Sequence, residues 1–292
     1  MKLSKGWGIQ VWASVALLTT LLAAQEVTPP AARFAPGERL RYQMDLKVNS
    51  ETRMAPLGEE FSDAAPTRLA FTLTWTLEAL AVEPDGSVRL QATIERFAVE
   101  SSRPRAALNP ANYEGRAVSY TLRADGSVTD VEAPEEWLEE GKLSAWFQTW
   151  LTQSSSSEAL PPGAQPGDRW SAERTLTVPG LPPLRLKTES SYLQDESFRD
   201  TACAAVLTHV RLENADPDAN ILTAQTILRS QVRGYGHSIN CYALSNGRLL
   251  DSMQTGQEDI LMEIERVQIG QRPVRLLLRA HMTTESYLCI TE

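Results

Sequence analysis

Histidine and cysteine are scarce in this chain, whose 292 residues include only three of each. No His-Glu-x-x-His motif is present, and no cysteine has a second cysteine or a histidine at the spacing of zinc ligands. We therefore expect neither a metal nor a cofactor. Gly-x-Ser-x-Gly and Ser-x-x-Lys are missing too, which removes the local motifs of serine hydrolases. These absences predict a protein that is not an enzyme.

Positive charge is also in short supply. The chain has 28 lysines and arginines against 37 acidic residues, for a net charge of −9. Phosphate backbones and anionic lipid headgroups repel such a surface at long range. We expect no nucleic-acid partner and no electrostatic docking to a membrane.

One long apolar run is present, from Val11 to Leu22. Lys2 and Lys5 precede it, and Ala23 and Ala24 follow. This is the layout of a secretory signal peptide, and the run is too short for a membrane span. We predict a signal peptide over residues 1–24 and a mature chain without a transmembrane span, exported to the bacterial periplasm or the cell exterior.

The three cysteines all fall in the expected mature chain. Cys203 and Cys241 lie in neighbouring β-like segments, so a disulfide between them is the preferred pairing in an oxidising compartment. The alternative is three buried thiols that pack as small hydrophobic groups.

Alternation of apolar and polar residues dominates the chain after residue 38. Residues 40, 42, 44, 46 and 48 are apolar or aromatic, and the residues between them are polar. Residues 69–77 alternate in the same way, and the turn Pro84-Asp85-Gly86-Ser87 follows. Residues 68–97 are therefore predicted to form a long β-hairpin.

The second half of the chain repeats this pattern. The strands predicted there are Trp170–Val178, Leu184–Leu193, Ala204–Leu212, Ile221–Val232, Ser238–Leu244, Asp259–Val267 and Val274–Met282. About ten strands joined by short turns predict a mainly β fold of one or more curved antiparallel sheets.

One segment breaks the alternation. From Pro134 to Gln153 the apolar spacing is that of an amphipathic α-helix, with Gly141 as its weak point. We expect this helix, about residues 134–153, to cover an open face of the sheet, either as a fixed plug or as a movable lid over an apolar ligand. The candidate ligand-binding residues are Trp137, Leu143, Trp146, Phe147, Trp150 and Leu151.

Serine and proline mark a linker over residues 154–167. It divides the mature chain into an N-terminal β half, residues 25–160, and a C-terminal β half, residues 161–292. Pro36-Gly37-Glu38-Arg39 and Pro166-Gly167-Asp168-Arg169 open the two halves, and Tyr120 and Tyr242 each precede an Asx-Gly turn. An internal repeat would give two similar β-layers, but these are also common turn signals, so duplication and coincidence both stay open.

The acidic residues give only weak evidence for a calcium site or for catalytic carboxylates. Residues 213–220 are rich in side-chain oxygens, but they lack the glycine and the closing glutamate of a calcium loop. The paired glutamates at 59–60, 135–136 and 139–140 are best explained as solvated groups.

Two motifs resemble those of uncharacterised exported bacterial β-sheet proteins: Phe34-x-Pro36-Gly37-Glu38-Arg39-Leu40-x-Tyr42, and Leu160-Pro161 followed by Gly167-Asp168-x-Trp170. This resemblance implies no activity. A leader, a long antiparallel sheet and a covering helix also look like the half-barrel of periplasmic lipoprotein carriers. That similarity implies a carrier role, and no residue of a carrier motif is matched.

The leading functional hypothesis is an exported, non-enzymatic envelope protein that binds an apolar ligand, such as a lipid, or a protein partner between sheet and helix. A structural or assembly module of the envelope without a ligand is the first alternative. An exported hydrolase with a non-local site is the second. Alternating strands are also typical of outer-membrane barrels, but the expected helix and the proline-rich linker fit poorly in one barrel wall.

Overall fold

The structure is a computed structural model. It describes residues 34–102, 109–123, 128–139, 142–143, 160–161, 163–176, 183–216, 220–222, 227–269 and 272–291. The expected leader, residues 1–24, lies outside the described residues, as do residues 140–141 and 144–153 of the expected helix. None of the helices in the described part is long and apolar enough to cross a membrane.

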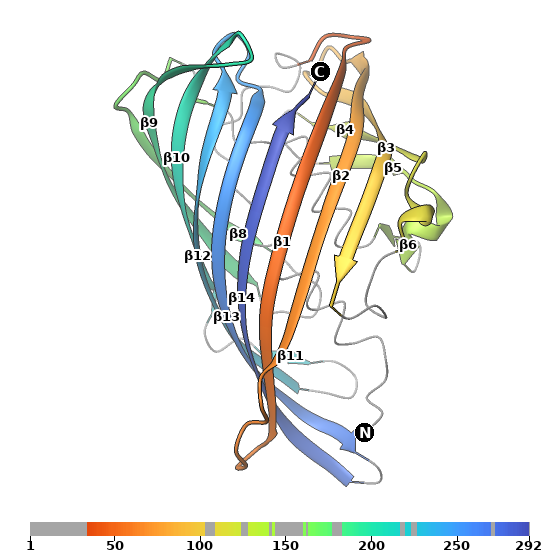
Figure 1. Ribbon diagram of the computed structural model, residues 1–292, viewed down its shortest axis with the longest axis vertical. Helices are drawn as coiled ribbons and strands as arrows, with labels where there is room; N and C mark the ends of the chain where they lie inside the picture. Colours follow the sequence, from red (N-terminus) through yellow and green to blue (C-terminus); the bar gives the residue numbers. More distant parts are fainter. Residues whose placement is uncertain are drawn as a thin grey trace.

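Strands make up most of the described residues (Figure 1). Their bounds are β1 (Arg39–Pro56), β2 (Ala65–Val82), β3 (Val88–Ser101), β4 (Ala117–Leu122), β5 (Val128–Glu132), β6 (Leu138–Glu139), β7 (Lys142–Leu143), β8 (Arg169–Leu176), β9 (Leu184–Phe198), β10 (Thr201–Asn214), β11 (Asn220–Leu222), β12 (Ile227–Ala243), β13 (Leu249–Ile269) and β14 (Arg272–Ile290). Short 3-10 helices occupy Pro110–Asn112 and Glu135–Trp137.

One large sheet contains nearly all of these strands. Within the described residues it has 12 strands in the order β5-β4-β3-β2-β1-β14-β13-β12-β10-β9-β8, with β11 paired to β12 off this path. Every pairing is antiparallel. The prediction of a mainly β protein with a curved antiparallel sheet is confirmed.

The predicted hairpin over residues 68–97 is confirmed as β2 and β3. Their turn is closed by Asp85, whose carboxylate accepts hydrogen bonds from the Ser87 N–H (2.9 Å) and hydroxyl (2.6 Å). These bonds hold the pKa of Asp85 below its usual value. Gly86 has a φ of 84°, a conformation that glycine adopts without strain.

The first and last strands join the two halves of the chain. β14 pairs with β1 from Tyr42–Ile290 to Pro56–Leu276, and it pairs with β13 on its other side. In Figure 1, β14 lies between β1 and β13, and the sheet curves away from this centre toward both edges. The halves therefore form one continuous sheet and not two layers.

The turns before β1 and β8 have the same hydrogen bonds. The Gly37 N–H donates to a carbonyl of β2 over 2.7 Å, and the Gly167 N–H donates to a carbonyl of β9 over 2.8 Å. The Glu38 and Asp168 carboxylates each accept from the backbone N–H three residues earlier. The internal repeat stays a prediction, and these two turns agree with it.

The expected amphipathic helix is not seen where the chain is described. The Trp137 N–H donates to the Pro134 carbonyl over 2.9 Å in a 3-10 turn, and β6 then pairs with β7 through Leu138–Leu143 and Glu139–Lys142. This register leaves two residues, one of them Gly141, between the paired strands. Glycine weakens a helix, so the apolar spacing of this segment is not by itself a sufficient signal for one.

The predicted break between Ile221–Val232 and Ser238–Leu244 is also wrong, because β12 runs through Gly234 and Gly236. A Cβ at Gly236 would lie 2.6 Å from the Thr255 carbonyl oxygen. A Cβ at Gly234 would lie 3.0 Å from Glu258 Cγ. Here glycine allows close approach of β12 and β13, and it does not end the strand.

Candidate functional site

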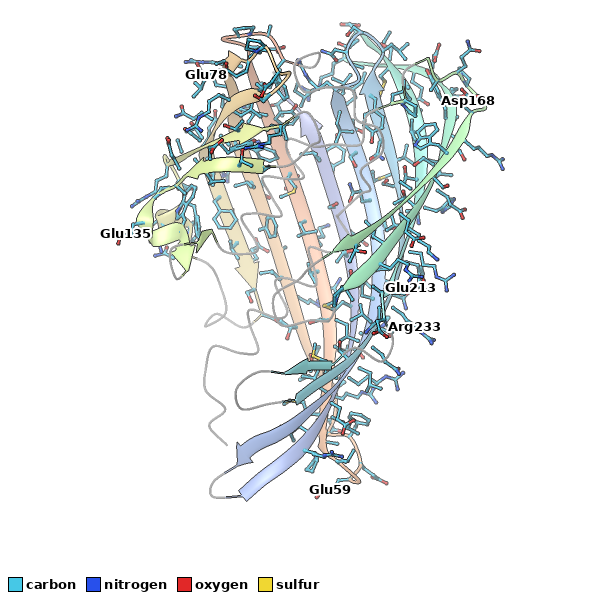
Figure 2. All side chains as sticks on the ribbon, turned by 180° about the vertical axis from the view of Figure 1, so that it is seen from behind. Glu59, Glu78, Glu135, Asp168, Glu213 and Arg233 are labelled. Carbon is cyan, nitrogen blue, oxygen red and sulfur yellow. A yellow bond between two sulfur atoms is a disulfide. The ribbon has the colours of Figure 1, made fainter. Side chains whose placement is uncertain are left out.

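The sheet has one face with mostly buried side chains, which we call the inner face, and an outer face with mostly exposed ones. On β1, Leu40, Tyr42 and Met44 belong to the inner face, and the polar residues between them belong to the outer face. Figure 2 shows side chains projecting from the outer side of the sheet, among them Glu213 and Arg233. The inner face is the candidate functional site because it unites two different chemical surfaces.

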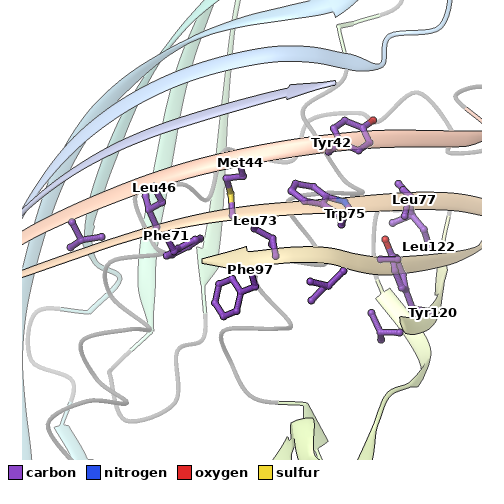
Figure 3. Close-up of a cluster of buried hydrophobic side chains, with 14 of the residues drawn as sticks. Tyr42, Met44, Leu46, Phe71, Leu73, Trp75, Leu77, Phe97, Tyr120 and Leu122 are labelled. Atoms are coloured by element: carbon purple, nitrogen blue, oxygen red, sulfur yellow. The ribbon is translucent and has the colours of Figure 1, made fainter. Parts of the chain in front are cut away.

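The first surface is an apolar wall formed by the inner face of β1–β4 (Figure 3). Tyr42 and Trp75 stack with ring centroids 5.4 Å apart. Phe97 lies edge-on to Phe71 at 6.0 Å and to Tyr113 at 5.2 Å. Aromatic pairs of this kind contribute about 0.5–1.5 kcal/mol each beyond the area that they bury. The wall is thus one cluster of buried apolar and aromatic side chains.

Trp137 belongs to this wall. Its ring lies 5.7 Å from that of Tyr113, and its indole N–H donates to the Asn112 carbonyl over 2.9 Å. Only 3% of Trp137 is exposed. The backbone of Leu143 lies in β7, and the other candidates, Trp146, Phe147, Trp150 and Leu151, lie outside the described residues. The structure thus places one of the six candidates in packing contacts and leaves the ligand contacts of all six untested.

The second surface is a polar belt on the inner face of β9, β10, β12, β13 and β14. Its members carry hydroxyl or amide groups and are buried or half-buried: Thr188, Ser190, Thr208, Ser238, Asn240, Ser252, Gln254 and Thr284. Strand register places Ser190, Thr208, Ser238 and Gln254 in one transverse row. Asn240 and Ser252 are opposite each other in the next row.

Hydrogen bonds link most of the belt. Gln254 Nε2 donates to Ser252 Oγ (3.0 Å), which donates to Asn240 Oδ1 (2.7 Å). Asn240 Nδ2 donates to Ser238 Oγ (3.0 Å), and the hydroxyls of Ser190 and Thr208 lie 2.9 Å apart. Gln254 Oε1 is buried and accepts no hydrogen bond within the described part of the chain. The belt therefore offers an acceptor to a polar group that enters it.

Apolar residues border the belt at both ends of the strands. Toward the start of β9 and the end of β10 lie Leu186, Leu212 and Ile260. Toward the other end lie Tyr192 and Tyr242 with their neighbours. Burial, together with a hydrogen bond to Asp195, raises the pKa of Tyr192 to about 12. The belt is an enclosed polar zone on an otherwise apolar face.

One acidic residue, Glu258, shares the inner face with the belt and is 1% exposed. It is opposite Gly234 on β12 and Met282 on β14. A Cβ at Gly234 would lie 3.0 Å from Glu258 Cγ and 3.3 Å from Leu212 Cβ, which is closer than an ordinary van der Waals contact. Gly234 therefore provides the space that this buried carboxyl group occupies.

The predicted disulfide is confirmed. Cys203 and Cys241 are bonded between β10 and β12, with Cα atoms 5.6 Å apart, and Cys289 is a buried free thiol. Asp251 is opposite both Cys241 and Cys289, and it is hydrogen-bonded to Tyr287. Burial is the main cause that raises the pKa values of Asp251, Tyr287 and Cys289.

The three histidines lie at solvent-accessible positions of the outer face. His281 Nδ1 is 2.9 Å from Asp259 Oδ1. His237 has its ring nitrogens 3.3 and 3.4 Å from Thr255 Oγ1, and it is opposite His209 on β10. Among the described residues, no three side chains of histidine, cysteine, aspartate or glutamate are already grouped to hold a metal ion.

The oxygen-rich segment at residues 213–220 has a structural use in its described part. The Asn214 side chain accepts from the Val232 N–H and donates to the Ser230 carbonyl, each over 2.7 Å. Glu213 lies 3.5 Å from Lys187 and 3.4 Å from Arg211. The Asn214 hydrogen bonds join β10 to β12, and the Glu213–Lys187 ion pair joins β10 to β9.

Sequence reasoning missed the polar belt, although a signal was present. Ser238 and Asn240 have the same alternation phase as Tyr242, and Thr208 has the phase of Val206 and Val210. In each strand, these polar residues thus lie at the alternating positions whose other members are apolar, and such positions face the buried side of the sheet.

Comparisons with known proteins give distant similarities. No family model matches the chain. Protein phosphatase 1 regulatory subunit 35 of Mus musculus is 28% identical over 207 residues, which cover 59% of this chain and 78% of that protein. The sequence and the fold together define a mainly β protein with one large antiparallel sheet and a disulfide.

Solved structures give similarly weak matches. Pseudomonas aeruginosa OpdQ is 6% identical, with 87% of this chain and 98% of that chain covered and a TM-score of 0.28. The P. putida toluene transporter TodX is 8% identical, with coverages of 91% and 93% and a TM-score of 0.16. The CymD monoaromatic hydrocarbon channel is 10% identical, with coverages of 93% and 95% and a TM-score of 0.12. Scores of this size establish no common fold.

Proposed function

We propose that this chain is an exported, non-enzymatic envelope protein that binds an amphiphilic ligand, such as a lipid, on the inner face of its sheet. The observation that carries the proposal is the change of chemistry across that one face. β1–β4 present the apolar wall, whereas β9, β10, β12, β13 and β14 present the polar belt between apolar borders. A hydrocarbon chain would lie against the wall, and its polar end would bind the belt.

Two energetic terms support a ligand with an apolar chain and a polar end. Each methylene that leaves water gains about 0.8 kcal/mol, so an acyl chain has a large driving force toward the wall. A buried polar group without a partner costs about 1–3 kcal/mol. The Gln254 Oε1 acceptor pays that cost in the described structure. A donor on the ligand would remove it.

The disulfide supports export. Such bonds persist in oxidising compartments such as the periplasm and are rare in the cytosol. The Cys203–Cys241 bond agrees with the expected leader.

A protein partner is the second candidate. β5 and β8 form the two edges of the sheet in the described part of the chain. An extended segment of an envelope protein would add to such an edge through main-chain hydrogen bonds.

Native mass spectrometry of the mature protein from its own envelope, followed by denaturing extraction and lipid analysis, tests the proposal. We expect a bound species with an acyl chain. A bare polypeptide mass would contradict ligand binding and would direct the search to cross-linked protein neighbours.

A variant tests the role of the belt. Ser252→Ala removes the hydroxyl between Gln254 and Asn240 without adding bulk. We expect a lower fraction of lipid-bound protein. Ser191→Ala, on the outer face of β9, is the matched control and should keep the wild-type fraction. An equal fraction of lipid-bound protein in the two variants would show that the belt is not part of the binding site.

A further inference from the structure

Two of the three histidines in the chain are direct cross-strand neighbours. The register of β10 and β12 places His209 opposite His237, and both are exposed on the outer face. Directly opposed residues of an antiparallel pair have Cβ atoms about 4.5–5.5 Å apart. Two imidazole rings at this separation are close enough to bind one ion together.

A carboxylate extends the same row. Glu189 on β9 is opposite His209 and is exposed on the same face. Glu189, His209 and His237 therefore stand side by side on three adjacent strands. The row continues on β13 with Thr255.

The surroundings suit a cation. The nearest basic side chains, Lys187 and Arg211, lie one alternation step away on β9 and β10. Both are within ion-pair distance of Glu213, at 3.5 and 3.4 Å. Lys187 is also 3.9 Å from Glu173. Acidic partners thus offset the positive charge beside the histidines.

We propose that His209 and His237 chelate a divalent transition-metal ion of the Cu²⁺ or Zn²⁺ type on the outer face, with Glu189 as a third ligand. Imidazole and carboxylate are ligands for these ions, and Cu²⁺ binds a given site more tightly than Zn²⁺. Water completes the coordination. This site is separate from the proposed lipid site, although Thr208 and Ser238 of the polar belt are the next residues along the two strands.

Metal binding requires side-chain rotation only. The His237 ring now lies against Thr255 Oγ1, and in the described chain no three ligands already converge. An exposed imidazole changes rotamer freely, whereas the strands hold the two Cα atoms in place.

The test is titration of the full-length, disulfide-intact protein with CuCl₂ and separately with ZnCl₂, followed by calorimetry. We expect one equivalent of Cu²⁺ to bind, and the electron paramagnetic resonance spectrum to show coupling to two nitrogens. His209→Gln and His237→Gln should each abolish this binding. Glu189→Gln should weaken it about tenfold or more.

His281→Gln is the matched control, because His281 is also on the outer face and is hydrogen-bonded to Asp259. It should bind like the wild type, and so should Cys289→Ala, which removes the buried thiol. Circular dichroism verifies that each variant is folded. Wild-type binding by His209→Gln or His237→Gln, or equal loss in His281→Gln, would overturn the proposal.

Discussion

At the scale of single residues, the glycines of β12 have a steric role. Gly236 is opposite Gly256, and its hydrogen points toward the Thr255 carbonyl oxygen. Gly234 makes room for the buried Glu258. Because neither has a positive φ, what these glycines supply is space and not backbone freedom.

We expect Gly236→Ala to destabilise the protein. Its Cβ would lie 2.6 Å from a backbone oxygen, which cannot move without disturbing the β12–β13 pairing. Overpacking of this kind costs about 1–3 kcal/mol. Urea unfolding measures the loss, and Gln231→Ala on the exposed face of β12 is the control. An equal or higher stability of Gly236→Ala would contradict the steric role.

Asp251 predicts a pH dependence of stability. Burial raises its pKa in the folded state, so the folded state binds this proton more tightly than the unfolded state does. The wild type should therefore lose stability relative to Asp251→Asn as the pH rises from below the ordinary aspartate pKa of 3.8 to neutrality. Asparagine keeps an acceptor for Tyr287. Urea unfolding of both proteins between about pH 3 and 7 measures the difference. A stability difference that does not change with pH would contradict the raised pKa of Asp251.

At the scale of elements, the disulfide joins β10 to β12 across a sequence separation of 38 residues. Along the chain, β11 and residues outside the described part separate β10 from β12, so the disulfide closes a long loop. Such a crosslink restricts the unfolded chain more than the folded one.

We expect the double variant Cys203→Ala/Cys241→Ala to be less stable by about 2–4 kcal/mol. The midpoint of denaturant unfolding measures this loss. Reduction of the wild type should produce a similar shift, and Cys289→Ala should respond to reduction as the wild type does. If the reduced and oxidised wild type unfold at the same midpoint, the bond adds no stability.

The second point at the scale of elements concerns a helical sequence pattern that the described structure does not follow. The spacing of residues 134–153 is helical, yet the described part forms a 3-10 turn and the β6–β7 hairpin. Trp137 is held by the Asn112 carbonyl and packs on the apolar wall. In the described part of this segment, the anchored indole and the β6–β7 pairing therefore replace the expected helix.

At the scale of the whole molecule, the pairing of β1 with β14 makes the two halves interdependent. Met44 is opposite Leu288, and Val48 is opposite Thr284, so the apolar wall meets the polar belt along this seam. Separation of the halves would expose two long, unpaired strand edges together with part of the buried face.

We expect residues 34–153 and 160–292 to aggregate when each is expressed alone, and to form a soluble complex when they are expressed together. Size-exclusion chromatography and circular dichroism measure both outcomes. A cooperative unfolding transition in either isolated half would contradict the dependence on the β1–β14 seam and would favour two independent domains.

The sequence by itself determined most of the strands and turns, and it favoured the disulfide pair that the structure contains. Alternation in residues 40–48 and 69–77 and the Asp85-Gly86 turn are local signals, and local chemistry is enough to read them. The Cys203–Cys241 pairing was a preference among alternatives until the structure paired β10 with β12. The same alternation contained the polar belt, because Ser238 and Asn240 share the phase of Tyr242. Of the candidate ligand residues, only Trp137 has a described side chain, and its contacts are structural.

Only the tertiary structure decided which distant strands meet and in what register. It placed β14 beside β1, aligned Ser190, Thr208 and Ser238 in one row, and set His209 opposite His237. Register between strands depends on the packing of a whole face, since a shift by one residue turns every side chain to the other side. That constraint involves all the strands at once, and no single segment of the sequence contains it.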